Sequence, residues 1–149
     1  MQANKRSQSL AVICREFSIQ ILYAFGSRAK ETRQWLDETL DKLSPSLSDL
    51  DVGVKPATPA GLTAREKVLL ALALEELFGI SRVDLVSIPE ADPFLAANII
   101  RGERLYADDS YLADEYDLYI LRRAGDLAPL ERERQALILG EEYDIRQDF

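Results

Sequence analysis

Short apolar runs alternate along the chain with longer segments in which apolar residues recur every three or four positions. The runs are rich in β-branched and aromatic residues, as buried strands are, whereas the longer spacing indicates helices that bury one face. The pattern predicts strands at residues 18–25, 49–55 and 82–88, and a short edge strand at 104–106. It predicts helices at residues 7–17, 29–43, 64–78, 91–102, 110–124 and 127–139, followed by a loose polar tail from Glu141 to Phe149.

Local signals support several of these elements. Thr63 is a plausible N-cap, and Glu66 three residues later completes a capping box. Gly79 is suited to end the same helix, which is apolar on nearly all sides around Val68–Leu74 and is therefore expected to be well buried. Both faces of the strand at 18–25 are apolar, which predicts a central position in a sheet.

Strands alternate with helices without a repeat or a linker, which predicts a single domain over residues 1–149 of the α/β or α+β class. The length of 149 residues and the 47% of apolar residues suit one domain with a real core. The longest apolar run is too short to span a bilayer, so no membrane association is expected.

Charge and composition exclude several functions. The net charge of −8 argues against broad nucleic-acid binding, which needs a basic surface to neutralise phosphates. The chain has no histidine, which excludes histidine-based triads and most zinc sites. Cys14 is the single cysteine, and the chain start has no signal-peptide pattern, so we expect a reducing cytoplasm.

Two aspartates lie at alternate positions of the second predicted strand. Side chains alternate between the faces of a strand, so Leu50, Val52 and Val54 point to the core while Asp49 and Asp51 point the other way. Two adjacent carboxylates repel unless a cation lies between them, and Mg²⁺ prefers such oxygen ligands. The alternative is that this common Asp-x-Asp pattern belongs to solvated residues.

A third aspartate, Asp84, interrupts the next apolar strand, where a charge is costly unless it is paired or bound to a metal. If this strand lies beside the second one, Asp84 faces Asp49 and Asp51. Three carboxylates on one face are the arrangement that a two-metal phosphoryl-transfer site requires. Asp84 is otherwise an exposed carboxylate at the sheet edge.

Gly26 and Ser27 lie where the first predicted strand ends and a helix begins. The free N–H groups of a helix N-terminus attract phosphate, and glycine allows the backbone to approach a ligand closely. Ser27 supplies a hydroxyl, while Arg28 and Lys30 add positive charge. Alternatively, Gly26 is only a turn residue and Ser27 only an N-cap.

Together, the segments Phe-Gly-Ser-Arg-Ala, Ser-Asp-Leu-Asp-Val-Gly-Val and Arg-Val-Asp-Leu-Val-Ser-Ile resemble, in this order, nucleotidyltransferases of the DNA polymerase β superfamily. The resemblance is strongest to the minimal nucleotidyltransferase (MNT) proteins and covers roughly Ile19 to Asp109. It implies a small mixed β-sheet with helices packed on it, a nucleotidyltransferase core at about 18–109 and a helical extension at about 110–140.

The resemblance also implies roles for individual residues. Gly26, Ser27 and Arg28 would bind the triphosphate of ATP. Asp49, Asp51 and Asp84 would hold Mg²⁺, with two ions expected, and Asp84 would help to deprotonate the acceptor. The family usually has about half as many residues between Gly-Ser and Asp-x-Asp, so the first helix is expected to be lengthened within Lys30–Ser48.

MNT proteins are typically paired with a HEPN-domain protein in toxin–antitoxin modules. The resemblance therefore implies a protein adenylyltransferase that neutralises a HEPN ribonuclease toxin. A non-catalytic antitoxin that masks the toxin is the alternative, and a nucleotidyltransferase acting on an aminoglycoside-like small molecule is the third hypothesis. Five of the six tyrosines lie from Tyr106 onward, where they suit either a partner surface or helix packing. Formation of a homo-oligomer stays open.

Overall fold

The structure, a computed structural model, describes residues 4–45 and 48–138. The predicted tail at 141–149, with Tyr143, lies outside these residues. The elements, with η for 3₁₀ helices, are α1 (Lys5–Glu16), β1 (Ile19–Phe25), η1 (Gly26–Arg28), α2 (Ala29–Leu36), β2 (Leu50–Pro56), α3 (Ala64–Phe78), β3 (Val83–Ser87), η2 (Ile88–Glu90), α4 (Pro93–Ile100), β4 (Glu103–Ala107) and α5 (Ser110–Ile138).

The four strands form one mixed sheet in the order β3-β2-β1-β4. β1 pairs antiparallel with both β2 and β4, whereas β2 pairs parallel with β3. The central position predicted for the first strand is therefore confirmed, as are the edge position of the Arg-Leu-Tyr strand and the α+β class with a small mixed sheet.

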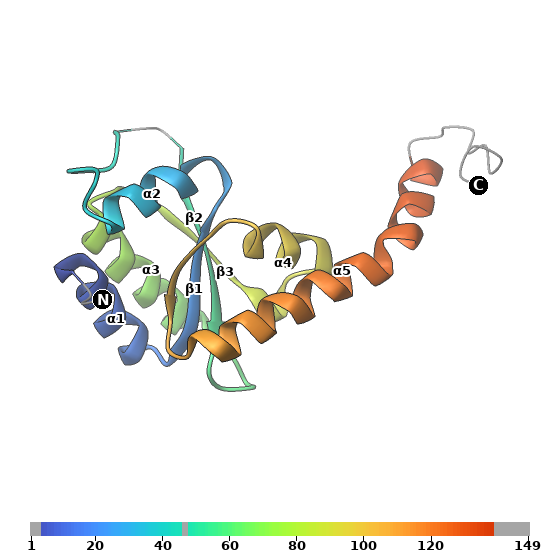
Figure 1. Cartoon of the computed structure of the whole chain (residues 1–149), viewed down its shortest axis with the longest axis horizontal. Helices are drawn as coiled ribbons and strands as arrows, with labels where there is room; N and C mark the ends of the chain where they lie inside the picture. The colour runs from blue at the N-terminus through green and yellow to red at the C-terminus, as the bar shows by residue number, and fades with distance from the viewer. Residues whose placement is uncertain (1–3, 46–47, 139–149) are drawn as a thin grey trace.

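Helices cover both faces of this sheet (Figure 1). One hydrophobic core joins α1, α2 and α3 to the face that carries Leu22 and Val52, and a second core joins α4 and α5 to the face that carries Tyr23. Along β2, Leu50, Val52 and Val54 all belong to the first core. The predicted division of this strand into two faces is thus confirmed for its apolar side.

The predicted ends of α3 are confirmed. Thr63 Oγ1 accepts a hydrogen bond from the Glu66 backbone N–H at 3.1 Å, and the Glu66 side chain accepts one from the Thr63 N–H at 2.9 Å. Gly79 ends the helix with a φ of +68°. The prediction that α3 is well buried is wrong, because Val68, Leu69 and Leu72 are 58%, 44% and 54% exposed. Only one side of α3 packs against the sheet, through Leu70, Leu74 and Phe78.

The helix predicted at 29–43 is shorter than expected. α2 ends at Leu36, and Glu38 then takes a φ of +62°. The Arg6 guanidinium, on α1, donates to the carbonyl oxygens of Trp35 and Leu40 at 2.7 Å, and to that of Asp41 at 2.9 Å. These bonds hold the chain in a turn instead of a longer helix, so residues 37–45 form an irregular loop. Leu40 and Leu43 still pack against the first core.

The two helices predicted at 110–124 and 127–139 are one helix, α5, over Ser110–Ile138. Gly125 is tolerated inside it, since glycine costs only about 1 kcal/mol relative to alanine in a helix. Pro129 lies inside the same helix, which bends on its way to the C-terminal end and extends away from the sheet (Figure 1). Within the described residues, none of the helices combines the length and apolarity needed to cross a membrane.

Replacement of Arg6 by alanine is expected to destabilise the fold. The change removes the three hydrogen bonds and the contact of the guanidinium with the Trp35 ring, whose centroid lies 4.6 Å away. We expect a loss of about 1–2 kcal/mol, or roughly 3–7 °C in Tm, measured by thermal unfolding. Lys5→Ala, an exposed change on the same helix, is the control. Equal Tm values for Arg6→Ala and the wild type would contradict this assignment.

Candidate active site

The parallel pairing of β2 and β3 brings Asp51 and Asp84 together. These residues are direct partners in the strand register, so their side chains leave the sheet on the same side. Asp51 is half-buried and Asp84 is exposed. The sequence-based expectation that the third predicted strand lies beside the second is confirmed.

Gly26 lies against the Asp51 carboxylate. Phe25, the last residue of β1, pairs with Asp51, and the chain then turns at Gly26 with a φ of +75°. A Cβ atom at Gly26 would stand 2.7 Å from Asp51 Oδ2. The glycine-serine turn and the second strand therefore meet at one place, although 24 residues lie between Gly26 and Asp51 in the sequence.

The hydroxyl of Ser27 is not used for helix capping. Neither η1 nor α2 has a side-chain hydrogen bond at its N-terminal cap, and Ser27 itself is exposed. The alternative in which Ser27 is only an N-cap therefore receives no support from this geometry.

Asp49 precedes β2 by one residue and points toward a cation. Its Oδ2 lies 3.4 Å from Nε of Arg82, and the two side chains are 39% and 75% exposed. Arg82 was not singled out from the sequence as a site residue, because an arginine one residue before a strand has no distinctive pattern. An exposed ion pair of this kind contributes little to stability, so Asp49 can exchange Arg82 for a cation that binds it more strongly.

The three carboxylates repel one another electrostatically. Burial raises the pKa of Asp51, and the neighbouring charges of Asp84 and Asp49 raise it further. Across residues 4–45 and 48–138, no lysine or arginine forms an ion pair with Asp51 or Asp84. This accumulated negative charge is suited to a divalent cation.

Mg²⁺ fits the donor atoms that are present, since it prefers carboxylate oxygens and completes its shell with water and phosphate. The part of the chain that the structure describes contains no ready-made group of three metal-binding side chains. Asp51 is close enough to both Asp84 and Asp49 to be affected by their charges, and Asp49 also forms the ion pair with Arg82. These residues can supply the ligands, with the remaining positions left to water and substrate.

A cleft of about 350 Å³ opens beside the glycine-serine turn. Gly26, Ser27 and Lys30 line one side, and Asn98 and Arg101 at the end of α4 line the other. Lys30 and Arg101 bring two positive charges to the cleft, against one negative charge from Glu103. Asn98 and Arg101 were missed from the sequence, because only the packing of α4 across the sheet brings them beside residues 26–30.

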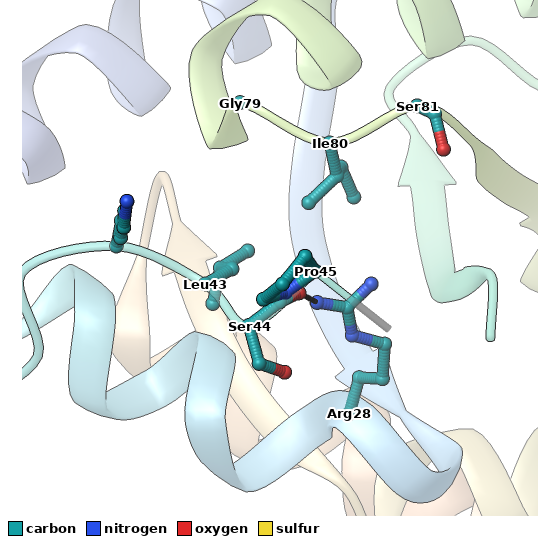
Figure 2. A pocket seen from close by; sticks show the side chains of 8 residues that line it. Arg28, Leu43, Ser44, Pro45, Gly79, Ile80 and Ser81 are labelled. Atoms are coloured by element: carbon teal, nitrogen blue, oxygen red, sulfur yellow. Dashed lines mark hydrogen bonds between the residues drawn. The ribbon is translucent and has the colours of Figure 1, made fainter. Parts of the chain in front are cut away.

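Arg28 is directed away from this cleft. It is 5% exposed, and its guanidinium donates to Glu31 Oε1 at 2.5 Å and to the carbonyl oxygens of Ser44 and Ser48 at 2.6 and 3.1 Å. Figure 2 shows it in a second cleft of about 440 Å³, between the loop at Leu43–Pro45 and the turn at Gly79–Ser81. Asp49, Asp51 and Asp84 line neither this second cleft nor the one beside the glycine-serine turn, but Gly26 of that turn lies against Asp51. Phosphate binding by Arg28 stays a prediction.

Comparison with known proteins gives a family and a fold. Residues 8–111 match the family model described as polymerase beta, nucleotidyltransferase. A toxin–antitoxin crystal structure with AMP-PNP is similar at 23% identity and a TM-score of 0.62, covering 89% of this chain and 94% of that chain. A tri-AMPylated Shewanella oneidensis HEPN toxin in complex with MNT antitoxin is similar at 20% identity and 0.60, covering 89% and 92%. The MntA–HepT toxin–antitoxin structure is similar at 20% identity and 0.59, covering 89% and 93%.

At these identities the structural matches show the shared fold. A search of curated proteins finds no match to this sequence.

Gly26→Ala is expected to displace the Asp51 carboxylate. The added Cβ would meet Asp51 Oδ2 at 2.7 Å, and the positive φ adds strain of roughly 1–2 kcal/mol. Gly79→Ala is the matched control, because it has a φ of +68° and nothing within 4 Å of the added Cβ. We expect both variants to lose stability in thermal unfolding, but only Gly26→Ala to weaken Mn²⁺ binding, measured by the EPR signal of free Mn²⁺. Equal Mn²⁺ affinities in the two variants would contradict the close approach.

Asp51→Asn is expected to stabilise the metal-free protein. Because the folded state raises the pKa of Asp51, its charged form costs stability, and this cost grows as the pH rises through the folded pKa. In EDTA at pH 7.5 we expect Asp51→Asn to raise Tm by roughly 1–3 °C. This gain should shrink as the pH falls and Asp51 of the wild type becomes protonated. A lower Tm for the variant at pH 7.5 would contradict the repulsion.

Proposed function

The chain belongs to the polymerase β nucleotidyltransferase family, and we propose that it transfers AMP from ATP to a partner protein. The partner in this proposal is a HEPN-domain toxin, which the transfer neutralises. The protein is then both an enzyme and the antitoxin of a toxin–antitoxin pair.

The convergence of Gly26 and Asp84 on Asp51 is the observation that supports transfer chemistry most strongly. Gly26, in the turn that would bind phosphate, lies against the Asp51 carboxylate, and Asp84 is the register partner of Asp51 in the neighbouring strand. A merely structural pair of aspartates would gain nothing from this arrangement, because it raises the pKa of Asp51 and costs stability. A bound divalent cation would offset that cost.

In the proposed complex, Gly26 and Ser27 bind the triphosphate, and Lys30 and Arg101 neutralise part of its charge. Asp49, Asp51 and Asp84 would hold Mg²⁺, with two ions expected, and the metal would supply charge stabilisation at the phosphates. The acceptor hydroxyl oxygen forms a bond to the α-phosphorus, and the bond from that phosphorus to the oxygen bridging to the β-phosphate breaks. Pyrophosphate leaves, and exposed Asp84 accepts the hydroxyl proton.

The proposed partner is supported by the structural relatives. One relative contains AMP-PNP, and another is an MNT antitoxin in complex with an AMPylated HEPN toxin. The net charge of −8 suits a basic partner surface. Tyr111 and Tyr119 on α5 are 70% and 55% exposed, so they are available for protein contact. The proposal includes a cytoplasmic location, where ATP and an RNA-cleaving toxin are both found.

The proposal is tested by co-expressing the chain with its HEPN partner and measuring intact masses after incubation with Mg-ATP. We expect the partner to gain one or more AMP units, and expect Asp49→Asn with Asp51→Asn to reduce the transfer at least 100-fold, the order of loss typical for removed electrostatic catalysis. Glu16→Gln with Glu76→Gln removes two exposed carboxylates from α1 and α3 and is the charge-matched control.

Three results bear on the alternatives. Transfer that survives the double aspartate change would contradict the assigned carboxylates. Neutralisation of the toxin in cells by the same variant, without transfer, would favour masking by binding. AMP transfer to a small alcohol in the absence of any partner protein would favour the small-molecule hypothesis.

A further inference from the structure

Arg28 is a buried cation that connects two parts of the site which are far apart in the chain. It follows Ser27 directly, and its side chain reaches the loop that leads to Asp49. The guanidinium is 5% exposed, and its Nε, Nη1 and Nη2 atoms each donate to a different group. A side chain used in this way is held by the protein instead of being presented to a ligand.

The two carbonyl partners of Arg28 are those of Ser44 and Ser48, at 2.6 and 3.1 Å. Ser48 is bonded covalently to Asp49, so the guanidinium holds the peptide group that carries this carboxylate. The planar fork of arginine offers donors in fixed directions, which allows one side chain to fix two carbonyl groups at once.

Glu31 completes this arrangement from α2. Its Oε1 accepts from Arg28 Nε at 2.5 Å, while its Oε2 accepts from Ser44 Oγ at 2.9 Å. Burial acts to raise the pKa of Glu31, but the hydrogen bonds from Arg28 and Ser44 lower it overall. An ionised Glu31 therefore holds both the guanidinium and the loop.

Asp49 needs such support more than Asp51 does. Asp51 lies within β2, where pairing with both β1 and β3 fixes its backbone. Asp49 lies before the first residue of the strand, and Ser48, which precedes it, belongs to no helix or strand. The position of its carboxylate therefore depends on the peptide group before it as well as on Arg82, with which it forms an exposed ion pair.

We propose that Arg28 is a positioning residue for Asp49, which it holds in place through the carbonyl groups of Ser48 and Ser44. This inference rests on the proposed function, in which Asp49 is a metal ligand. It gives Arg28 a role different from direct phosphate binding, and the two roles predict different binding data.

Mn²⁺ affinity, read from the EPR signal of free Mn²⁺, tests the positioning role without any activity assay. We expect Arg28→Ala to weaken Mn²⁺ binding about tenfold, as loss of a residue that orients a metal ligand does. Arg28→Lys should also weaken it, because lysine lacks the planar fork by which three separate nitrogen atoms of Arg28 reach Glu31, Ser48 and Ser44. Lys42→Ala, which removes a cation lining the same cleft, is the control and should bind Mn²⁺ like the wild type.

The affinity for ATP in EDTA separates the two roles. The positioning role predicts that Arg28→Ala leaves metal-free ATP binding unchanged. Weakened ATP binding in Arg28→Ala together with normal Mn²⁺ affinity would overturn the inference in favour of phosphate contact. Circular dichroism checks that the variants are folded, and Arg28→Lys decides the question if Arg28→Ala does not fold.

The outcomes also separate this inference from the proposed function. Normal metal binding and AMP transfer by the wild type, with Mn²⁺ affinity unchanged in both Arg28 variants, would overturn the inference alone. Failure of the wild type to bind Mn²⁺ or to transfer AMP would overturn the proposed function, and the positioning role with it.

Discussion

The pairing of β2 with its two neighbours is the constraint on which the site depends. On one side the antiparallel register with β1 places the end of that strand beside Asp51, and on the other the parallel register with β3 places Asp84 beside it. A shift of one residue in either register would turn these side chains to the opposite face. The apolar residues of β2 prevent such a shift, because Leu50, Val52 and Val54 are fully buried in the first core. Core packing thus fixes the position of a charged residue that the core itself does not contain.

The same arrangement carries a cost in stability. Burial and two neighbouring carboxylates act together against the charged form of Asp51. Gly26 beside it has a positive φ, and only the absence of a Cβ atom there leaves room for the carboxylate. Such local conflicts are expected at functional sites and rarely elsewhere. The remainder of the domain supplies the compensation through two cores and well-capped helices such as α3. The loop at 37–45 has no regular secondary structure, and its backbone carbonyl groups are held by hydrogen bonds from the side chains of Arg6 and Arg28.

Elements with strong local signals could be predicted from the sequence. The capping residues Thr63 and Gly79, and the alternation of Leu50, Val52 and Val54, depend on neighbours within a few positions. Two of the failures were tertiary in origin. Leu36, Leu40 and Leu43 have helical spacing, but a guanidinium from α1 holds this segment in a turn. Val68, Leu69 and Leu72 are apolar yet exposed, because only one side of α3 meets the sheet.

The site residues likewise divide into those with a local signal in the sequence and those that only the packing of the fold brings together. Gly26, Asp51 and Asp84 were identified because a charge or a glycine interrupts an apolar strand, which is visible in the sequence. Arg82, Asn98 and Arg101 had no such signal, since packing alone brings them to the site. The direction of Arg28 was equally hidden, because it depends on carbonyl groups of a loop without a pattern.

A crystal structure with Mn²⁺ and a non-hydrolysable ATP analogue tests the central claim most directly, namely that the glycine-serine turn and the carboxylates form one site. The anomalous signal of manganese locates the metal independently of the protein density. The account predicts a manganese peak at ligating distance from Asp51, with the triphosphate against Gly26 and Ser27. Manganese bound away from Asp51, or a triphosphate seated in the cleft of Arg28 and Lys42, would contradict it.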